Sequence, residues 1–325
     1  MSDFPNPESY HTPFADGQKR FLSKYLIDIK IPFIVKKEKD QYIYDIDGNK
    51  YCDFCLNDGS VISGHNNKVI TNYLKNGISA GSSSCFTHKS LYKLYRYIST
   101  IINFEHIAFF NSFEESINRI LFEKKPGNIG VNTNYLFNKL LTHSIGLQIE
   151  LVQENKEYDM IIYEPINMDG DLSNFKIHDY SGKTFIAYEG RTAFRLKYGF
   201  LSSLNNADYI VSSNNIANGL DVSMVLSRNR LKSDLIPLYK GIAILETMKY
   251  YKRKIHYGKN ISADGPYLDI QRGSIIKLKK DYSSDILYTH GIILKGKILF
   301  LSEFHTEFDL KRLWRALESL EKSFL

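Results

Sequence analysis

From about residue 106 the sequence alternates between short apolar runs and stretches with the residue spacing of a helix. The predicted strands are Ile107–Phe110, Asn128–Val131, Gln148–Val152, Met160–Tyr163, Thr184–Tyr188 and Tyr209–Ser212. Strands that are separated by helices pair in parallel, because each helical crossover returns the chain to the same edge of the sheet. The helices then cover both faces of that sheet. The middle of the chain is therefore predicted to be an α/β domain with a mainly parallel sheet.

The residues before this region predict a small antiparallel unit. Short strands are expected at Phe33–Lys37, Tyr42–Ile46 and Tyr51–Cys55. The turn Asp47-Gly48-Asn49 favours a hairpin between the last two, because Gly and Asn tolerate positive φ.

The last third of the chain mixes both element types. A helix is expected at Ile242–Lys252, and a final amphipathic helix at Glu307–Phe324. Short strands are expected at Ser274–Lys279, Gly291–Leu294 and Ile298–Leu301. We therefore expect three parts: residues 1–60 as the start of a small lobe, residues 61–235 as the large α/β domain, and residues 236–325 as a C-terminal α+β lobe.

Composition excludes several classes of protein. The net charge of +6 is scattered along the chain, so no nucleic acid is expected as a partner. No apolar run reaches the length of a membrane span, and the polar N-terminus is unlike a signal peptide, so we expect a cytoplasmic protein without membrane contact. The nine histidines show no metal-ligand spacing, and Cys52 and Cys55 lie in a predicted strand, so no metal site is expected.

Several blocks, in the same order along the chain, resemble class III aminotransferases. They include Tyr42–Phe54 (YIYDIDGNKYCDF), Ser63-Gly64-His65, Tyr163-Glu164-Pro165 and Phe304–Leu310. The resemblance is closest to the glutamate-1-semialdehyde aminomutases. It implies a fold type I scaffold: a large domain with a mainly parallel sheet, and a small α+β lobe made from both ends of the chain. Enzymes of this kind use pyridoxal phosphate and act as dimers.

The resemblance fails at the residue that would bind this cofactor covalently. Residues 208–221 resemble the loop that carries the cofactor's lysine, and Asn214 stands at the lysine position. An amide can neither form a Schiff base nor move a proton.

The other cofactor contacts are also replaced. Asn111–Ser116 stands where the family wraps the phosphate, and there Ser112 is kept, Phe113 replaces a glycine and Glu114 places a carboxylate against the phosphate. Ser112 to Glu115 instead match a helix capping box. Tyr188 stands at the position of the aspartate that pairs with the pyridine nitrogen.

Two further segments lack the expected pattern. Ile129–Leu141 has Tyr135 and Phe137 but no His-Gly, which in the family stacks on the cofactor ring. Asp234–Lys240 does not contain the loop that brings a threonine across the dimer.

We therefore predict an aminotransferase-like protein that has lost pyridoxal-phosphate catalysis, with no cofactor and no assignable catalytic residue. It would act as a binding or regulatory subunit, either as a homodimer or as a heterodimer with an active paralogue. Ser112, Phe113, Glu114, Tyr188 and Asn214 would be vestigial cleft positions.

Two alternatives remain open at this point. The chain could be an enzyme of another class that uses the old cleft for a small molecule, with a pocket formed by Glu114, Tyr188, Glu189, Arg191 and Asn214. It could also be a strongly diverged aminotransferase that uses pyridoxal phosphate through a displaced lysine, for which Lys183 and Lys197 are the candidates.

Overall fold

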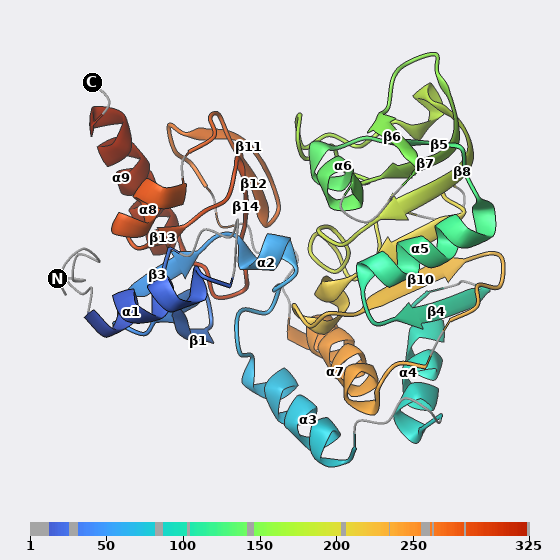
Figure 1. Ribbon diagram of the computed structural model, residues 1–325, viewed down its shortest axis with the longest axis horizontal. Coiled ribbons are helices and arrows are strands. Elements are labelled where there is room, and N and C mark those ends of the chain that lie inside the picture. Colours follow the sequence, from blue (N-terminus) through green and yellow to red (C-terminus); the bar gives the residue numbers. More distant parts are fainter. Residues whose placement is uncertain are drawn as a thin grey trace. The chain divides into compact units, whose positions relative to one another are not determined.

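The computed structural model describes residues 13–25, 32–81, 87–102, 105–141, 146–202, 206–233, 235–254, 261, 263–282 and 284–323. The chain divides into two compact units (Figure 1). One takes in residues 1–58, 63–67 and 259–325, and the other residues 59–62 and 68–258. Cys85, Asp234 and Phe324 lie outside the described residues.

A seven-stranded sheet organises the larger unit, in the order β4-β10-β9-β8-β7-β5-β6. Its strands are β4 (His106–Phe110), β5 (Asn128–Val131), β6 (Gln148–Leu151), β7 (Glu157–Tyr163), β8 (Ser181–Tyr188), β9 (Tyr209–Ser212) and β10 (Ser223–Ser227). Strands β6, β5, β7, β8 and β9 pair in parallel, whereas β10 is antiparallel to both β9 and β4. The predicted α/β class with a mainly parallel sheet is thereby confirmed, although β10 was not predicted.

Both faces of this sheet are buried. Neighbouring residues along a strand belong to different apolar clusters: Ile161, Ala187 and Ile210 to one, and Ile162, Ile186 and Val211 to the other. This follows from the two-residue period of a strand. It also explains why these strands are apolar throughout rather than alternating.

Five helices of the larger unit are α3 (Lys68–Ser79), α4 (Lys89–Ser99), α5 (Phe113–Lys124), α6 (Asn134–Leu141) and α7 (Leu238–Lys254). Leu91, Leu94 and Ile98 of α4 belong to the first cluster, and α5 and α6 contribute Phe113, Ile117 and Leu136 among others to the second. Helix α7 packs on both α3 and α4, as Figure 1 also shows. It therefore lies in the larger unit, whereas the sequence analysis assigned it to the lobe that starts at residue 236.

The smaller unit joins the two ends of the chain. In its four-stranded sheet, β1 (Val35–Lys39), β2 (Tyr42–Asp45) and β3 (Lys50–Asp53) form an antiparallel meander, and β13 (Ile292–Ile293) adds to β3 in parallel. A second sheet has the order β11-β12-β14. Helices also lie in or at the border of this unit. The bounds of these strands and helices are β11 (Leu268–Arg272), β12 (Ile275–Leu278), β14 (Ile298–Phe300), α1 (Pro13–Leu22), α2 (Leu56–Gly59), α8 (Ser284–Thr289) and α9 (Glu307–Ser323).

A buried histidine links the meander to the chain that follows it. His65 Nε2 lies 2.8 Å from Asp53 Oδ2, and Nδ1 lies 2.9 Å from Glu38 Oε2. Burial alone would lower the pKa of His65, but the hydrogen bonds to the two carboxylates raise it to about 9. The imidazolium is thus a structural cation of this unit at neutral pH.

Neither a membrane-spanning helix nor a cluster of metal ligands is found among the described residues. No helix among them combines the length and the apolar character that a membrane span requires. In that same portion of the chain, no group of three or more His, Cys, Asp or Glu side chains is placed to hold a metal ion.

Candidate functional site

The carboxyl ends of β5, β7, β8 and β9 meet at one edge of the large sheet, which is where open α/β sheets bind ligands. The residues that directly follow these strands are Asn132, Glu164, Glu189 and Ser213, and Thr133 comes after Asn132. The polar and aromatic groups at this edge form three sets of contacts.

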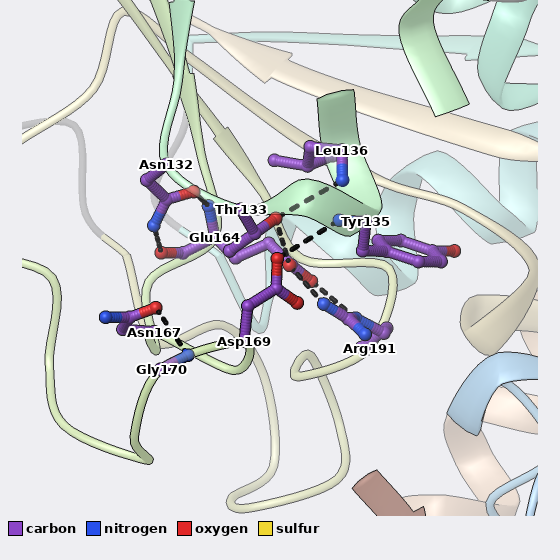
Figure 2. Close-up of polar contacts among 9 residues, drawn as sticks. All are labelled: Asn132, Thr133, Tyr135, Leu136, Glu164, Asn167, Asp169, Gly170 and Arg191. Atoms are coloured by element: carbon purple, nitrogen blue, oxygen red, sulfur yellow. Dashed lines mark hydrogen bonds and ion pairs between the residues drawn. The ribbon is translucent and has the colours of Figure 1, made fainter. Parts of the chain in front are cut away.

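The first set is an ion pair between Glu164 and Arg191 (Figure 2). Arg191 Nε donates to Glu164 Oε1 at 2.7 Å, and Nη2 donates to Oε2. Thr133 Oγ1 also donates to Oε2, at 2.9 Å. Burial alone would lower the pKa of the Arg191 guanidinium. The Glu164 carboxylate beside it outweighs this effect and raises the pKa above its ordinary value. The charge of Arg191 is therefore already matched inside the protein.

The surroundings fix this ion pair in place. Asn132 exchanges two hydrogen bonds with the Glu164 backbone, each 2.9 Å long, and Thr133 Oγ1 caps α6 by accepting from Leu136 N. The Arg191 guanidinium lies over the ring of Tyr135, at 3.8 Å from its centroid. These contacts make Arg191 part of a rigid network rather than a free anion receptor.

The second set is an aromatic cluster formed by Phe113, Tyr135 and Tyr188. Phe113 and Tyr188 are both buried, and their ring centroids lie 4.6 Å apart at an interplanar angle of 61°. Tyr135 and Tyr188 are stacked, at 6.5 Å and 23°. Lys139, one turn beyond Tyr135 on α6, places its Nζ 4.6 Å from the Phe113 ring and 5.8 Å from the Tyr188 ring. Three rings and a lysine ammonium group thus lie together at this edge.

Gly190 allows the Tyr188 side chain to fold back over the chain. A Cβ at position 190 would lie 2.1 Å from Tyr188 Oη and 2.8 Å from Ser213 Oγ. The same hydroxyl is hydrogen-bonded to Ser213 Oγ at 3.1 Å. Glycine at 190 and tyrosine at 188 are therefore sterically coupled.

The third set closes the start of α5. Ser112 Oγ accepts from Glu115 N at 3.2 Å, and Glu115 Oε2 accepts from Asn111 N at 2.6 Å. The Ser112 half of the predicted capping box is present, whereas the Glu115 side chain accepts from Asn111 N rather than from Ser112 N. Two amides of this helix start are therefore already bonded within the chain. Glu114, in the first turn of α5, is half-buried. Its carboxylate acts on Asp221: burial raises the pKa of Asp221, Lys240 opposes this increase, and Glu114 adds to it.

Glu189 is directed elsewhere. Its fully buried carboxylate accepts from Leu201 N at 2.9 Å, Ser202 N at 2.6 Å and Thr192 Oγ1 at 3.3 Å. Burial raises the pKa of Glu189, although these hydrogen bonds oppose the increase. The side chain holds the segment at 201–202 in place, which is a structural role.

Asn214 and its neighbour differ sharply. Asn214 is half-buried at the start of the short 3₁₀ helix Asn214–Ala217. The Asn215 amide, fully buried, donates to Glu189 O at 3.1 Å and Ala193 O at 2.8 Å, and accepts from Ser212 Oγ at 2.9 Å. Sequence reasoning placed the interest on Asn214 and missed the structural role of Asn215.

The lysines near this edge are not those proposed from the sequence. Lys183 lies exposed at the opposite end of β8, paired with Asp159 at 2.8 Å, and Lys197 is exposed. Lys139 lies against the aromatic cluster, and Lys240 Nζ donates to Asn111 O at 3.1 Å. The four-residue spacing between Tyr135 and Lys139, which puts both on one helix face, was the available signal.

Comparisons with known proteins match part of the sequence to the class III aminotransferases. Residues 28–119 match the family model of class III aminotransferases. Glutamate-1-semialdehyde 2,1-aminomutase of Methanocaldococcus jannaschii is 35% identical over 114 residues, which cover 35% of this chain and 25% of that protein. The enzyme of the same name from Campylobacter hominis is 49% identical over 57 residues, covering 16% and 13%.

Solved structures extend the likeness to almost the whole chain. The FumI protein of Sphingopyxis sp. MTA144, in its PLP internal aldimine form, has a TM-score of 0.74 at 11% identity, covering 96% of this chain and 98% of that one. Ornithine δ-aminotransferase of Plasmodium falciparum has a TM-score of 0.69 at 16% identity, covering 95% and 98%.

The architecture is that of the fold type I aminotransferases. More particularly, residues 28–119 carry the class III aminotransferase sequence pattern, and the curated relatives named above are glutamate-1-semialdehyde aminomutases, which confirms the resemblance. The alignments span a quarter of the M. jannaschii enzyme and 13% of the C. hominis enzyme. They therefore support a relationship in sequence and do not show that this chain catalyses the same reaction.

Proposed function

We propose that this chain is an aminotransferase- or aminomutase-like protein that does not use pyridoxal phosphate and serves as a binding or regulatory subunit. The observation that carries the proposal is the packing of Phe113, Tyr135 and Tyr188 against one another. The resemblance assigns these positions or segments to the phosphate, the ring face and the ring nitrogen of the cofactor. Here these positions carry rings that pack against one another, which supports the proposal.

The polar groups at the same edge support the proposal. A phosphate at the start of α5 would meet the Glu114 carboxylate, and like charges about 4 Å apart repel by about 4 kcal/mol at an effective dielectric constant near 20. Glu115 already satisfies Asn111 N, the donor that an anion there would compete for. Asn214 supplies an amide and no amine, so the residues present do not fit the cofactor.

A visible-absorbance titration with pyridoxal phosphate tests this proposal, followed by borohydride reduction and mass analysis. The expected result is no saturable band and no stoichiometric lysine adduct. One lysine labelled to completion at stoichiometric cofactor would overturn the proposal, and its position would be compared with Lys139 and Lys240. Low labelling spread over exposed lysines such as Lys183 marks ordinary surface reactivity and agrees with the proposal.

The subunit part of the proposal implies a partner surface on the larger unit. Helices α3 and α4 pack on α7 and carry large apolar or aromatic side chains that are 37–62% exposed in the isolated chain. They are Val69, Tyr73, Ile78, Tyr92 and Tyr95. Exposed groups of this kind favour a protein interface, here a homodimer or a heterodimer with a lysine-bearing paralogue.

Light scattering coupled to size exclusion tests the homodimer. The Tyr73→Glu variant is expected to shift the mass toward the monomer, whereas the control Lys75→Glu, an exposed position on the same helix, is expected to keep the native mass. If the native chain is monomeric at every concentration and does not copurify with a co-expressed paralogue, the subunit proposal is wrong.

A further inference from the structure

A pocket of about 420 Å³ lies at the amino ends of the parallel strands, at the end of β8 remote from Tyr188. Its volume falls within the roughly 300–1,000 Å³ of small-molecule sites. The stretch from Gly182, which lines this pocket, to Tyr188 spans about 20 Å at the rise of a parallel strand. A ligand held here is therefore well separated from the aromatic cluster at the carboxyl edge.

Two walls of the pocket are attached to one stack of rings. Tyr180 lines the pocket and stacks on Phe175 at 5.1 Å and 14°. Phe175 stacks in turn on Tyr163, at 5.3 Å and 30°. Tyr163 Oη donates to the backbone oxygen of Asn206, which lines the pocket from another side, at 3.1 Å. The ring stack thus holds the two walls in a fixed relation.

The base of the pocket is also fixed. Phe185 N donates to Asp208 Oδ2 and Asp208 N donates to Phe185 O, both at 2.8 Å. A Cβ at Gly182 would lie 3.0 Å from the side chain of Ile161, so this glycine lets the core approach the pocket closely from behind. A pocket held by such contacts needs little ordering when a ligand binds, which favours affinity.

The lining groups point to one chemical class of ligand. Arg228, which directly follows β10, brings a guanidinium to the pocket, and His178 lies on the same lining. A planar guanidinium pairs with carboxylate or phosphate through two hydrogen bonds. Tyr180 and Phe185 present aromatic surface for a flat ring.

We propose that this pocket binds a small aromatic anion, with its ring against Tyr180 and its acidic group on Arg228. Asp208 also lines the pocket, and its Oδ2 accepts from Phe185 N, so this carboxylate already has a partner within the protein. This site does not depend on whether the chain uses pyridoxal phosphate, because the pocket shares no residue with the aromatic cluster.

Calorimetric titration with phenyl phosphate tests the proposal, with benzoate and inorganic phosphate as comparison ligands. We expect saturable binding of phenyl phosphate or benzoate, at least tenfold tighter than that of inorganic phosphate, because only the aromatic anions use both parts of the site. The stronger of the two identifies whether the acidic group is a phosphate or a carboxylate.

Three variants assign the binding to this pocket. Arg228→Ala is expected to weaken binding at least tenfold and Tyr180→Ala about fivefold, whereas Arg230→Ala, an exposed arginine of the same loop outside the lining, is expected to stay within twofold. Arg228 and Arg230 are both exposed, so either variant is expected to fold, which its melting temperature verifies. Equal weakening by both arginine variants would overturn the proposal, as would the lack of saturable binding of both aromatic anions.

Discussion

The hydroxyl of Tyr188 occupies the space in which Gly190 would carry a Cβ, at 2.1 Å from its ideal position. The backbone at Gly190 is outside the left-handed region, so an alanine would be permitted there by its conformation and opposed only by the tyrosine and Ser213. The residue type at 190 is therefore tied to the ring at 188.

This coupling predicts the result of a double-mutant cycle. Gly190→Ala should lower the free energy of unfolding by about 1–3 kcal/mol, because the added methyl overpacks a buried site. Tyr188→Ala should cost about 3–5 kcal/mol by leaving a cavity. The double variant should be about 1–3 kcal/mol more stable than the sum predicts, because the removed ring makes room for the methyl. Urea denaturation measures all four proteins, and additive losses would refute the coupling.

The two adjacent asparagines should respond differently to truncation. Asn215→Ala removes an amide that satisfies two buried backbone carbonyls and one buried hydroxyl, so we expect a loss of about 2–3 kcal/mol in unfolding free energy. Asn214→Ala is the matched control and should change stability by less than about 0.5 kcal/mol. Thermal or urea unfolding compares the pair, and a larger loss at 214 would contradict the assignment.

Restoring the lysine alone should not restore the cofactor. Asn214→Lys is expected to stay colourless with pyridoxal phosphate, because Phe113 and Tyr188 still fill the space. A variant that combines Asn214→Lys with Tyr188→Asp, Phe113→Gly and Glu114→Thr should gain a saturable visible band. Circular dichroism confirms that each variant folds. A yellow single variant, or a folded but colourless combined variant, would show that these rings and charges are not the barrier.

The smaller unit should lose stability in mild alkali. The pKa of His65 is raised to about 9 in the folded chain from about 6.5 when unfolded, so its stabilising effect is complete below pH 6.5 and is lost as pH rises through 9. The full effect is about 3 kcal/mol. His65→Gln should flatten this dependence, while His178→Gln, an exposed histidine, should leave it unchanged. Unfolding measured between pH 6 and 10 decides between them.

The sequence predicted the sheet well, because its strands carry strong local signals. Ile161 and Ile162 belong to an unbroken apolar run, as a strand buried on both faces requires. Strand β10 was missed because Ser223 and Ser227 interrupt its apolar pattern, and both serines are buried in the sheet. Helix α7 was placed in the wrong unit because sequence shows that a helix is present, not which neighbours it packs on.

The candidate site could be predicted only in part. The loss of specific chemical groups at 188 and 214 can be read directly from residue types. The pairing of Glu164 with Arg191 could not, because the two residues come from different strands and meet only through the fold. The contact between the rings of Phe113 and Tyr188 likewise could not be predicted, because the two residues belong to separate elements. Of the predicted pocket, Arg191 and Glu189 are committed to internal partners.

The packing of Phe113, Tyr135 and Tyr188 also has a consequence for the amount of folded protein in the cell. Many cofactor-dependent enzymes are stabilised by mass action when the small molecule binds the native state, so their folded amount follows its concentration. A chain that binds no pyridoxal phosphate, as proposed for this one, has no such dependence. Its folded amount would therefore not follow the supply of vitamin B6, and would stay the same during vitamin B6 starvation.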